Sequence, residues 1–208
     1  SPAGLAPRQL GAAGVVFALG GRLVALARAG AEPSRLRAAS LAYVVAYALG
    51  LSVWAYDLVM ELVEGPAYTV LPPYFFMGGF VSGLAWVAFV AAMRGISGPD
   101  LRHDLGKLLF GFIIVWTYLL WSLFLPTWYG NVPEESAALL ERWAGPYRPL
   151  SVFVLVTVFA WPFWLLFSER LKRRRGTLAA GAGAILLGLW TERFLLVVPS
   201  IPGPGGAA

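Results

Sequence analysis

The chain has 208 residues, of which 59% are aliphatic, aromatic or sulfur-containing and only 13% are charged. About a quarter of a soluble domain is charged, so this composition excludes a soluble protein and indicates one that resides in lipid. A bilayer core about 30 Å thick takes about 20 apolar residues per helix, which leaves room for about six spans and no large soluble domain. The sequence predicts an all-α, polytopic integral membrane protein in which residues 1–208 form a single transmembrane helical bundle.

The formal charge of +5 does not indicate nucleic acid here, because lysines and arginines of a membrane protein are first sorted by membrane side. Cysteine is absent and His103 is the only histidine. This chain alone can therefore ligate neither a thiolate-held iron–sulfur cluster nor a bis-histidine haem. We expect no metal and no cofactor bound by this chain alone.

Apolar segments of spanning length follow one another along the whole chain. The expected spans are residues 11–29, 36–63, 74–93, 104–128, 150–167 and 177–198. Pro72 and Pro73 are expected to form a break before the third span, and Pro126 to bend the last turn of the fourth.

The connection between the fourth and fifth spans carries helix signals of its own. Pro133 suits a first helical position, two glutamates follow it, and Gly145 suits the position after a last turn. These signals predict a short interfacial helix lying on the membrane surface. The tail at 201–208 is expected to be disordered.

Basic residues gather in the loops after the first, third and fifth expected spans. They are Arg28, Arg35, Arg37, Arg94, Arg102, Lys107, Arg170, Lys172, Arg173, Arg174 and Arg175. The positive-inside rule assigns these loops to the cytoplasm. Both termini and the surface helix are then expected outside.

Ionisable side chains near the hydrocarbon are costly enough that each needs an explanation. A first group, His103, Asp104 and Lys107, stands at the expected start of the fourth span, where Asp104 suits the helix dipole and shares a face with Lys107. One interpretation is a helix cap with interfacial anchors. The other is an entry point for protons or a contact to a quinone headgroup.

Two further groups lie near the opposite side. Asp57, Glu61 and Glu64 stack along one face of the second span and are either a solvated helix end facing a partner or a site that carries a proton. Arg193 is expected to form a structural ion pair with Asp57 or Glu61 if their helices are neighbours. Glu192 is then left as a candidate for proton transfer.

Several motifs together resemble one family. The segment 103–110 (HDLGKLLF), the residues Trp116-Thr117-Tyr118 and the segment 128–135 (WYGNVPEE) resemble the F-type membrane subunit (ActF-like) of alternative complex III. That complex is a bacterial quinol:cytochrome c oxidoreductase, and the subunit belongs to the NrfD-like, or polysulphide-reductase membrane-subunit, superfamily. The resemblance covers roughly residues 35–199.

The resemblance implies that haems and iron–sulfur clusters belong to partner subunits of a respiratory or photosynthetic electron-transfer complex in the bacterial inner membrane. The implied partners are cytochrome and iron–sulfur subunits, other membrane and periplasmic subunits, a sister NrfD-like subunit and lipid. Menaquinone or ubiquinone is the implied quinone. Family members usually carry another helical bundle ahead of this region, which we expect to be missing here, supplied by another chain or not included in this sequence.

We therefore expect a non-redox subunit that anchors redox partners and provides a proton path. The candidate residues of that path, from the inside outward, are His103, Asp104, Tyr118, Glu192, Asp57 and Glu61.

Two alternatives remain open. The first is a direct quinone site built from His103, Asp104 and Lys107, with Trp116 or Tyr118 as the stacking wall. The second is a small secondary transporter, although such folds tend to show internal repeats and none is evident here.

Overall fold

The structure, a computed structural model, describes residues 2–59, 70–96, 98–130, 143 and 146–197 of the chain. Every regular element in these residues is a helix, and none is a strand, which confirms the all-α class. Within the described ranges, six helices are long and apolar enough to span a membrane: Ala6–Arg28, Pro33–Asp57, Leu71–Arg94, Pro99–Gly130, Arg148–Phe167 and Arg175–Val197. The protein is therefore a multi-pass membrane protein.

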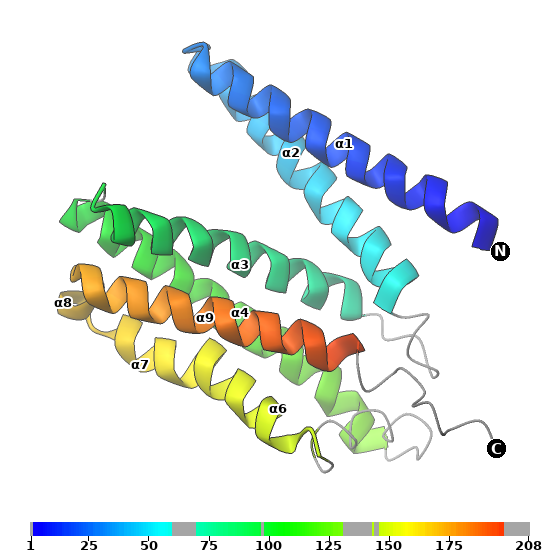
Figure 1. Ribbon diagram of the computed structural model, residues 1–208, viewed down its shortest axis with the longest axis vertical. Coiled ribbons are helices and arrows are strands. Elements are labelled where there is room, and N and C mark those ends of the chain that lie inside the picture. The colour runs from blue at the N-terminus through cyan, green and yellow to red at the C-terminus, as the bar shows by residue number, and fades with distance from the viewer. Residues whose placement is uncertain (1, 60–69, 97, 131–142, 144–145, 198–208) are drawn as a thin grey trace. The chain divides into compact units, whose positions relative to one another are not determined.

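The helices fall into two compact units, residues 1–61 and 62–208. A single domain over residues 1–208 stays a prediction. The first unit is a helical hairpin of α1 (Pro2–Arg28) and α2 (Pro33–Trp54), and α2 continues into the π-helical segment η1 (Ala55–Val59) (Figure 1). A Cβ atom at Gly20 or Gly50 would lie 3.1 Å from Tyr43 or Val16 of the facing helix, so these glycines permit the close approach of α1 and α2.

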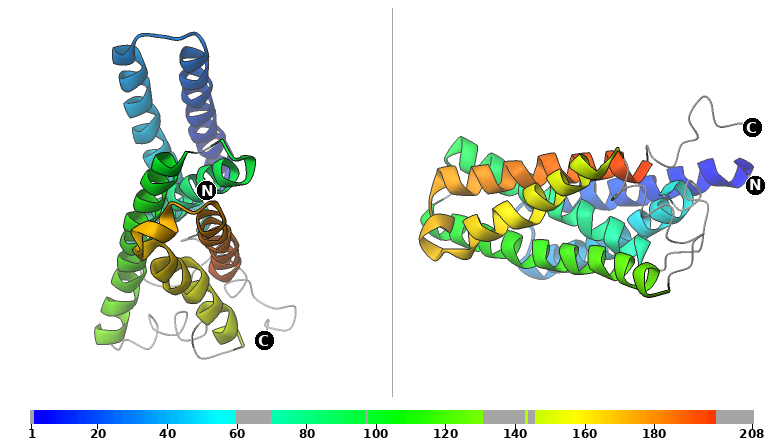
Figure 2. Two further views of the ribbon diagram at one scale, coloured as in Figure 1. Left: turned by 90° about the vertical axis from the view of Figure 1, so that its left-hand side faces the viewer. Right: turned by 90° about the horizontal axis from the view of Figure 1, so that it is seen from below.

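The second unit contains the other four spans. These are α3 (Leu71–Arg94), α4 (Pro99–Gly130), a rod made of α6 (Arg148–Val154), η3 (Leu155–Ala160) and α7 (Trp161–Phe167), and α9 (Arg175–Val197), with the short α8 (Glu169–Lys172) before α9. Helix α9 packs against both α3 and the rod, and α4 packs against α3. Figure 2 shows α4 and the rod diverging toward the end at which α6 begins.

Proline explains why three spans begin earlier than the sequence predicted. Helix α2 begins at Pro33 rather than at 36, α3 begins at Leu71 and includes Pro72 and Pro73, and α4 begins at Pro99 rather than at 104. A first-turn N–H has no partner within its helix, so proline, which lacks that N–H, fits there without loss. The predicted break at Pro72 and Pro73 is therefore wrong, because both residues lie inside the first turn of α3.

The other three spans also begin earlier than predicted, and the first differs most. Helix α1 begins at Pro2 rather than at 11, the rod at Arg148 rather than at 150, and α9 at Arg175 rather than at 177. Pro126 lies inside α4, and the bend expected there stays a prediction. The expected surface helix, apart from Trp143, and the expected disordered tail lie outside the described residues.

The rod passes through a proline without ending. The wider π-helical turns of η3 end at Ala160, two residues before Pro162. Proline in a helix removes one hydrogen bond and its ring clashes with the carbonyl four residues earlier, and a π segment changes the register of those bonds. The span consequently continues to Phe167.

Candidate functional site

Four polar or charged side chains are buried in the described part of the chain: Asp57, Ser151, Lys172 and Glu192. Burying such groups is unfavourable unless they are bonded or neutralised. The contacts of each of these four side chains therefore indicate whether it has a structural role or is a candidate functional group.

Glu192 lies on a pocket of about 360 Å³ within the second unit. Pockets that bind small molecules range from about 300 to 1,000 Å³. The pocket is bounded by α3, α4, α9 and the rod, and its lining residues are Leu71, Tyr74, Thr117, Leu120, Trp121, Leu123, Phe124, Trp143, Ser151, Val154, Leu155, Glu192, Leu195 and Leu196. It thus combines an apolar and aromatic wall with a few polar groups, as expected of a ligand site.

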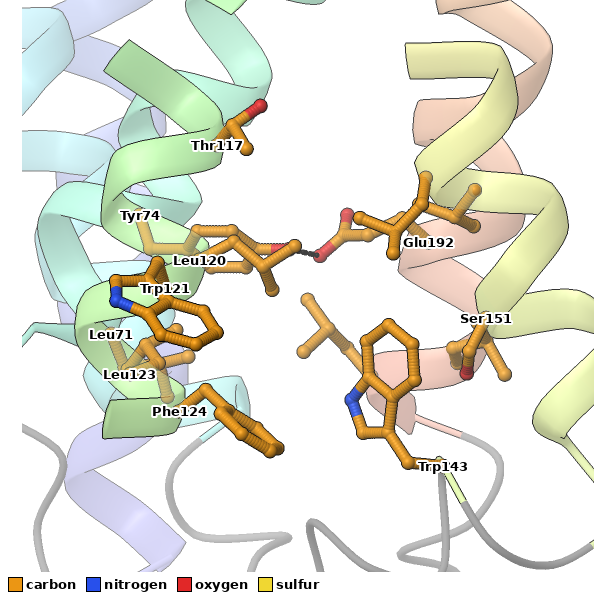
Figure 3. A pocket seen from close by; sticks show the side chains of 14 residues that line it. Leu71, Tyr74, Thr117, Leu120, Trp121, Leu123, Phe124, Trp143, Ser151 and Glu192 are labelled. Atoms are coloured by element: carbon orange, nitrogen blue, oxygen red, sulfur yellow. Dashed lines mark hydrogen bonds between the residues drawn. The ribbon is translucent and has the colours of Figure 1, made fainter. Parts of the chain in front are cut away.

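A tyrosine and a glutamate meet at one side of this pocket. Tyr74 on α3 donates its phenol O–H to Glu192 Oε1 on α9 at 2.8 Å, as Figure 3 shows. The exposed fractions of the two residues are only 2% and 4%. The Trp116 ring packs against Tyr74 with 5.6 Å between ring centroids, which fixes the direction of the phenol.

Aromatic rings form the part of the pocket beyond this pair. Trp121 stacks on Phe124 at 5.7 Å between centroids, and Phe124 meets Trp143 edge-on at 6.4 Å. In Figure 3 these rings lie on the same side of the Tyr74–Glu192 bond. Flat aromatic faces of this kind can hold a planar ligand by stacking.

Arg193 supplies the positive charge beside Glu192. Its Nε lies 3.4 Å from Glu192 Oε2, its Nη2 donates to the Phe75 carbonyl oxygen at 2.9 Å, and its Cζ lies 3.9 Å from the centre of the Phe75 ring. The sequence predicted that Arg193 pairs with Asp57 or Glu61 if their helices are neighbours. Arg193 instead pairs with Glu192, while Glu61 lies outside the described residues.

Asp57 belongs to the first unit, where it joins α2 to α1. Arg8 donates to Asp57 through two nitrogens, Nε at 2.7 Å and Nη2, and Gln9 donates through Nε2 at 2.5 Å. Because three donors converge on this buried carboxylate, the arrangement suits a fixed structural charge. Sequence reasoning missed Arg8 as the partner, since nothing local links residues almost fifty positions apart.

In the expected group at the start of the fourth span, Asp104 and Lys107 are exposed and His103 is partly buried. Helix α4 begins at Pro99, with Asp100 in its first turn, so the prediction that Asp104 occupies the first turn is wrong. Asp104 and Lys107 form an ion pair at 3.4 Å, with 65% and 55% of their side chains exposed. Such surface pairs contribute little to stability.

The structure does not assemble the direct quinone site predicted around His103. His103 and Trp116 lie thirteen residues apart on α4, which places them about 20 Å apart along the helix axis. One headgroup cannot contact both residues. Trp116 is also fully buried against Tyr74.

Tyr118, a candidate residue of the predicted proton path, lies on an exposed face of α4. It is 66% exposed, and it is absent from the pocket lining that contains its neighbour Thr117. The structure brings Glu192 to Tyr74 and Arg193, and sequence reasoning missed Tyr74. Its only signal was a lone tyrosine in an otherwise apolar helix.

Charged residues hold together the end of the second unit away from the pocket. Arg173 on the segment after α8 pairs with Asp100 at 2.8 Å and with Glu169 at 3.1 Å, and Arg102 Nε donates to the Arg173 carbonyl oxygen. The hydrogen bond and positive charge of Arg173 hold the pKa of Glu169 below its ordinary value. Lys172 is buried beside these residues, with its Nζ 5.4 Å from the Phe110 ring centre.

One family model matches nearly the whole chain. Its description is "Polysulphide reductase, NrfD", and the match covers residues 8–202. No curated protein matches the chain.

Proposed function

The chain belongs to the NrfD family, and from that premise we propose that it is the membrane subunit of a quinol-oxidising complex that binds the quinol headgroup in the pocket beside Glu192. NrfD proteins are membrane subunits that work with partner redox subunits. The observation that carries the proposal is the buried Tyr74–Glu192 pair on an apolar, aromatic pocket of about 360 Å³.

The pocket has the chemistry that a quinol headgroup requires. A quinol is a flat ring with hydroxyl groups, so the aromatic wall of Trp121 and Phe124 can stack on the ring while a polar group receives a hydroxyl. The Glu192 carboxylate accepts a proton from that hydroxyl, and the Tyr74 hydrogen bond orients the carboxylate. A positioned carboxylate of this kind acts as a general base.

Oxidation of one quinol releases two electrons and two protons. In our proposal one proton goes to Glu192, the other goes to water, and both electrons go to a redox centre of a partner subunit. The chain has no cysteine and one histidine, and its described residues contain no group of three metal-ligating side chains placed to hold an ion. We therefore assign haem and iron–sulfur clusters to cytochrome and iron–sulfur partner subunits.

The pocket also has a definite side of the membrane in this proposal. It is lined by the first turn of α3, the later part of α4 and the last turns of α9. The basic connections at 94–99 and 168–175 lie at the opposite ends of these helices, and the Arg175 bond to the Met93 carbonyl joins them. With the basic end in the cytoplasm of a bacterial inner membrane, the termini lie outside and quinol releases its protons toward the outside.

Two conservative variants test the quinol site. In membranes that contain the chain with its companion subunits, Glu192→Gln and Tyr74→Phe should lower the rate of oxidation of reduced decylubiquinone or reduced menadione. We expect a loss of about 100-fold for Glu192→Gln, the lower part of the range for a general base. Asp100→Asn, which changes an exposed carboxylate outside every candidate site, is the control and should keep the full rate. Full turnover by Glu192→Gln would exclude the proposal.

A second measurement maps the ligand directly. A photoreactive quinone should label pocket residues such as Trp121 or Phe124, and excess unlabelled quinone should prevent that labelling. Labelling confined to companion subunits would instead favour an anchoring subunit without a quinone site.

Within the NrfD family we propose the F-type subunit of alternative complex III as the nearest type. The support is the resemblance in the segments 103–110 and 128–135. Purification of the native complex tests this assignment: a multihaem cytochrome, an iron–sulfur subunit and a sister NrfD-like subunit should accompany the chain. A complex with a different set of companions would leave the chain as another type of NrfD subunit.

A further inference from the structure

We infer that Arg193 is a positioning residue for the Glu192 carboxyl group, and that Gly78 on α3 is the position that admits its guanidinium. The inference rests on the proposed function, in which Glu192 receives the proton of the quinol. It adds two residues that do not line the pocket.

Three contacts on different groups fix the Arg193 guanidinium. Its Nε faces Glu192 Oε2 at 3.4 Å, its Nη2 donates to the Phe75 carbonyl oxygen at 2.9 Å, and its plane lies over the Phe75 ring with Cζ at 3.9 Å. A planar guanidinium can contact two oxygen atoms through its nitrogens and stack on an aromatic ring at the same time. A lysine ammonium provides only a point charge.

The two oxygens of the Glu192 carboxyl group have different partners. Oε1 accepts the Tyr74 hydrogen bond, and Oε2 faces Arg193. Tyr74 and Phe75 are neighbours in the first turns of α3, so a single helix end fixes both sides of the carboxyl. Adjacent residues on α9 point about 100° apart, so Arg193 reaches Oε2 because α3 holds its guanidinium in place.

Gly78 is what makes this geometry possible on the α3 side. A Cβ atom added at Gly78 would overlap Arg193 Nη2 and would lie 3.3 Å from Cζ, while Trp116 Nε1 would be 3.5 Å away. The overlapping atom is the far end of a flexible side chain. Alanine at this position is therefore expected to displace the guanidinium and leave the helices where they are.

Gly78→Ala is the first test, with Gly83→Ala as its matched control. Both glycines lie inside α3, but a Cβ atom at Gly83 would meet no atom within 4 Å. In membranes with the companion subunits and reduced decylubiquinone as substrate, Gly78→Ala should lower kcat about tenfold, the equivalent of one hydrogen bond to a charged group. Its KM should stay within about twofold, because Arg193 does not contact the pocket, and Gly83→Ala should match the unmodified protein.

An infrared measurement supplies a readout that a purely structural role would not change. The Glu192 carboxyl band in the difference spectrum between oxidised and reduced complex is assigned by its loss in Glu192→Gln. That band should shift in Gly78→Ala and in Arg193→Gln, and it should keep its position in Gly83→Ala. Arg193→Gln serves as the second variant if Gly78→Ala accumulates poorly.

The outcomes separate this inference from the proposed function. If Glu192→Gln oxidises quinol at the full rate, the proposed function fails and the inference falls with it. If Glu192→Gln is impaired but Gly78→Ala and Arg193→Gln retain both kcat and the carboxyl band, only the positioning role is overturned. A rise in KM with unchanged kcat would also overturn it, since Arg193 would then act on binding.

Discussion

Replacing Gly188 by alanine should destabilise the second unit by overpacking the contact between α9 and the rod. A Cβ atom at Gly188 would overlap Thr157 Oγ1 and would lie 2.5 Å from Val158 Cγ2. Both neighbours are β-branched and have stiff side-chain torsions, and the Thr157 hydroxyl is bonded to the Phe153 carbonyl oxygen at 2.7 Å. Neither side chain can turn away easily.

The size of the effect follows from how far the helices must separate. An ordinary contact of a Cβ atom begins at 3.4 Å, so α9 and η3 must move apart by about 1 Å at this point, and overpacking of this kind costs about 1–3 kcal/mol. Glycine to alanine in a helix also gains up to about 1 kcal/mol of helix propensity. Gly111→Ala provides that gain alone, because a Cβ atom at Gly111 on α4 would meet nothing within 4 Å.

Comparison of the two variants isolates the clash. Unfolding of the purified chain in mixed micelles with rising fractions of sodium dodecyl sulfate, followed by tryptophan fluorescence, should give Gly188→Ala a free energy of unfolding about 1–3 kcal/mol below that of Gly111→Ala. Equal or greater stability of Gly188→Ala would show that α9 does not pack on η3 at this distance. Since Glu192 lies one turn further along α9, the same variant should also lower quinol turnover.

Three further predictions concern residues away from the pocket. Asp57→Asn should destabilise the hairpin of the first unit by about 1–3 kcal/mol in the same unfolding assay, because its charged hydrogen bonds weaken. The control Asp104→Asn, which changes an exposed ion pair, should cost less than about 1 kcal/mol. Equal effects of the two variants would contradict the structural role of the buried Asp57 carboxylate. The pKa of Glu169 is held below 4.5, chiefly by its hydrogen bond with Arg173. The contribution of this pair to stability is therefore present above pH 4.5 and is lost as the pH falls through the lowered pKa. Glu169→Gln should remove that part of the pH dependence of unfolding, and an unchanged dependence at acid pH would refute the pairing. The chain has no cysteine, so single cysteines can be introduced and labelled without background. An impermeant maleimide applied to intact spheroplasts should label Gly130→Cys but not Gly98→Cys. The reverse pattern would invert the proposed orientation.

Length and hydropathy alone determined the number of spans and the all-α class. The insertion of a helix in lipid depends on the summed transfer free energy of about 20 consecutive residues, a local quantity that the sequence contains in full. Helix starts were less well predicted because a proline can either open a helix in its first turn or interrupt one. At Pro33 and Pro99 it opens a helix, and only the placement of the preceding chain distinguishes an opening from a break.

The sequence also identified Glu192 as an unusual buried charge, but the tertiary structure decided its partners. Tyr74 lies 118 positions away from Glu192, and a hydrogen bond across that separation depends on which faces of α3 and α9 meet. The same holds for Asp57, whose partner Arg8 lies on the facing helix. The free-energy cost of burying a charged side chain depends on the residue type, which the sequence gives. The partner of that side chain depends on how the helices pack, which only the tertiary structure gives.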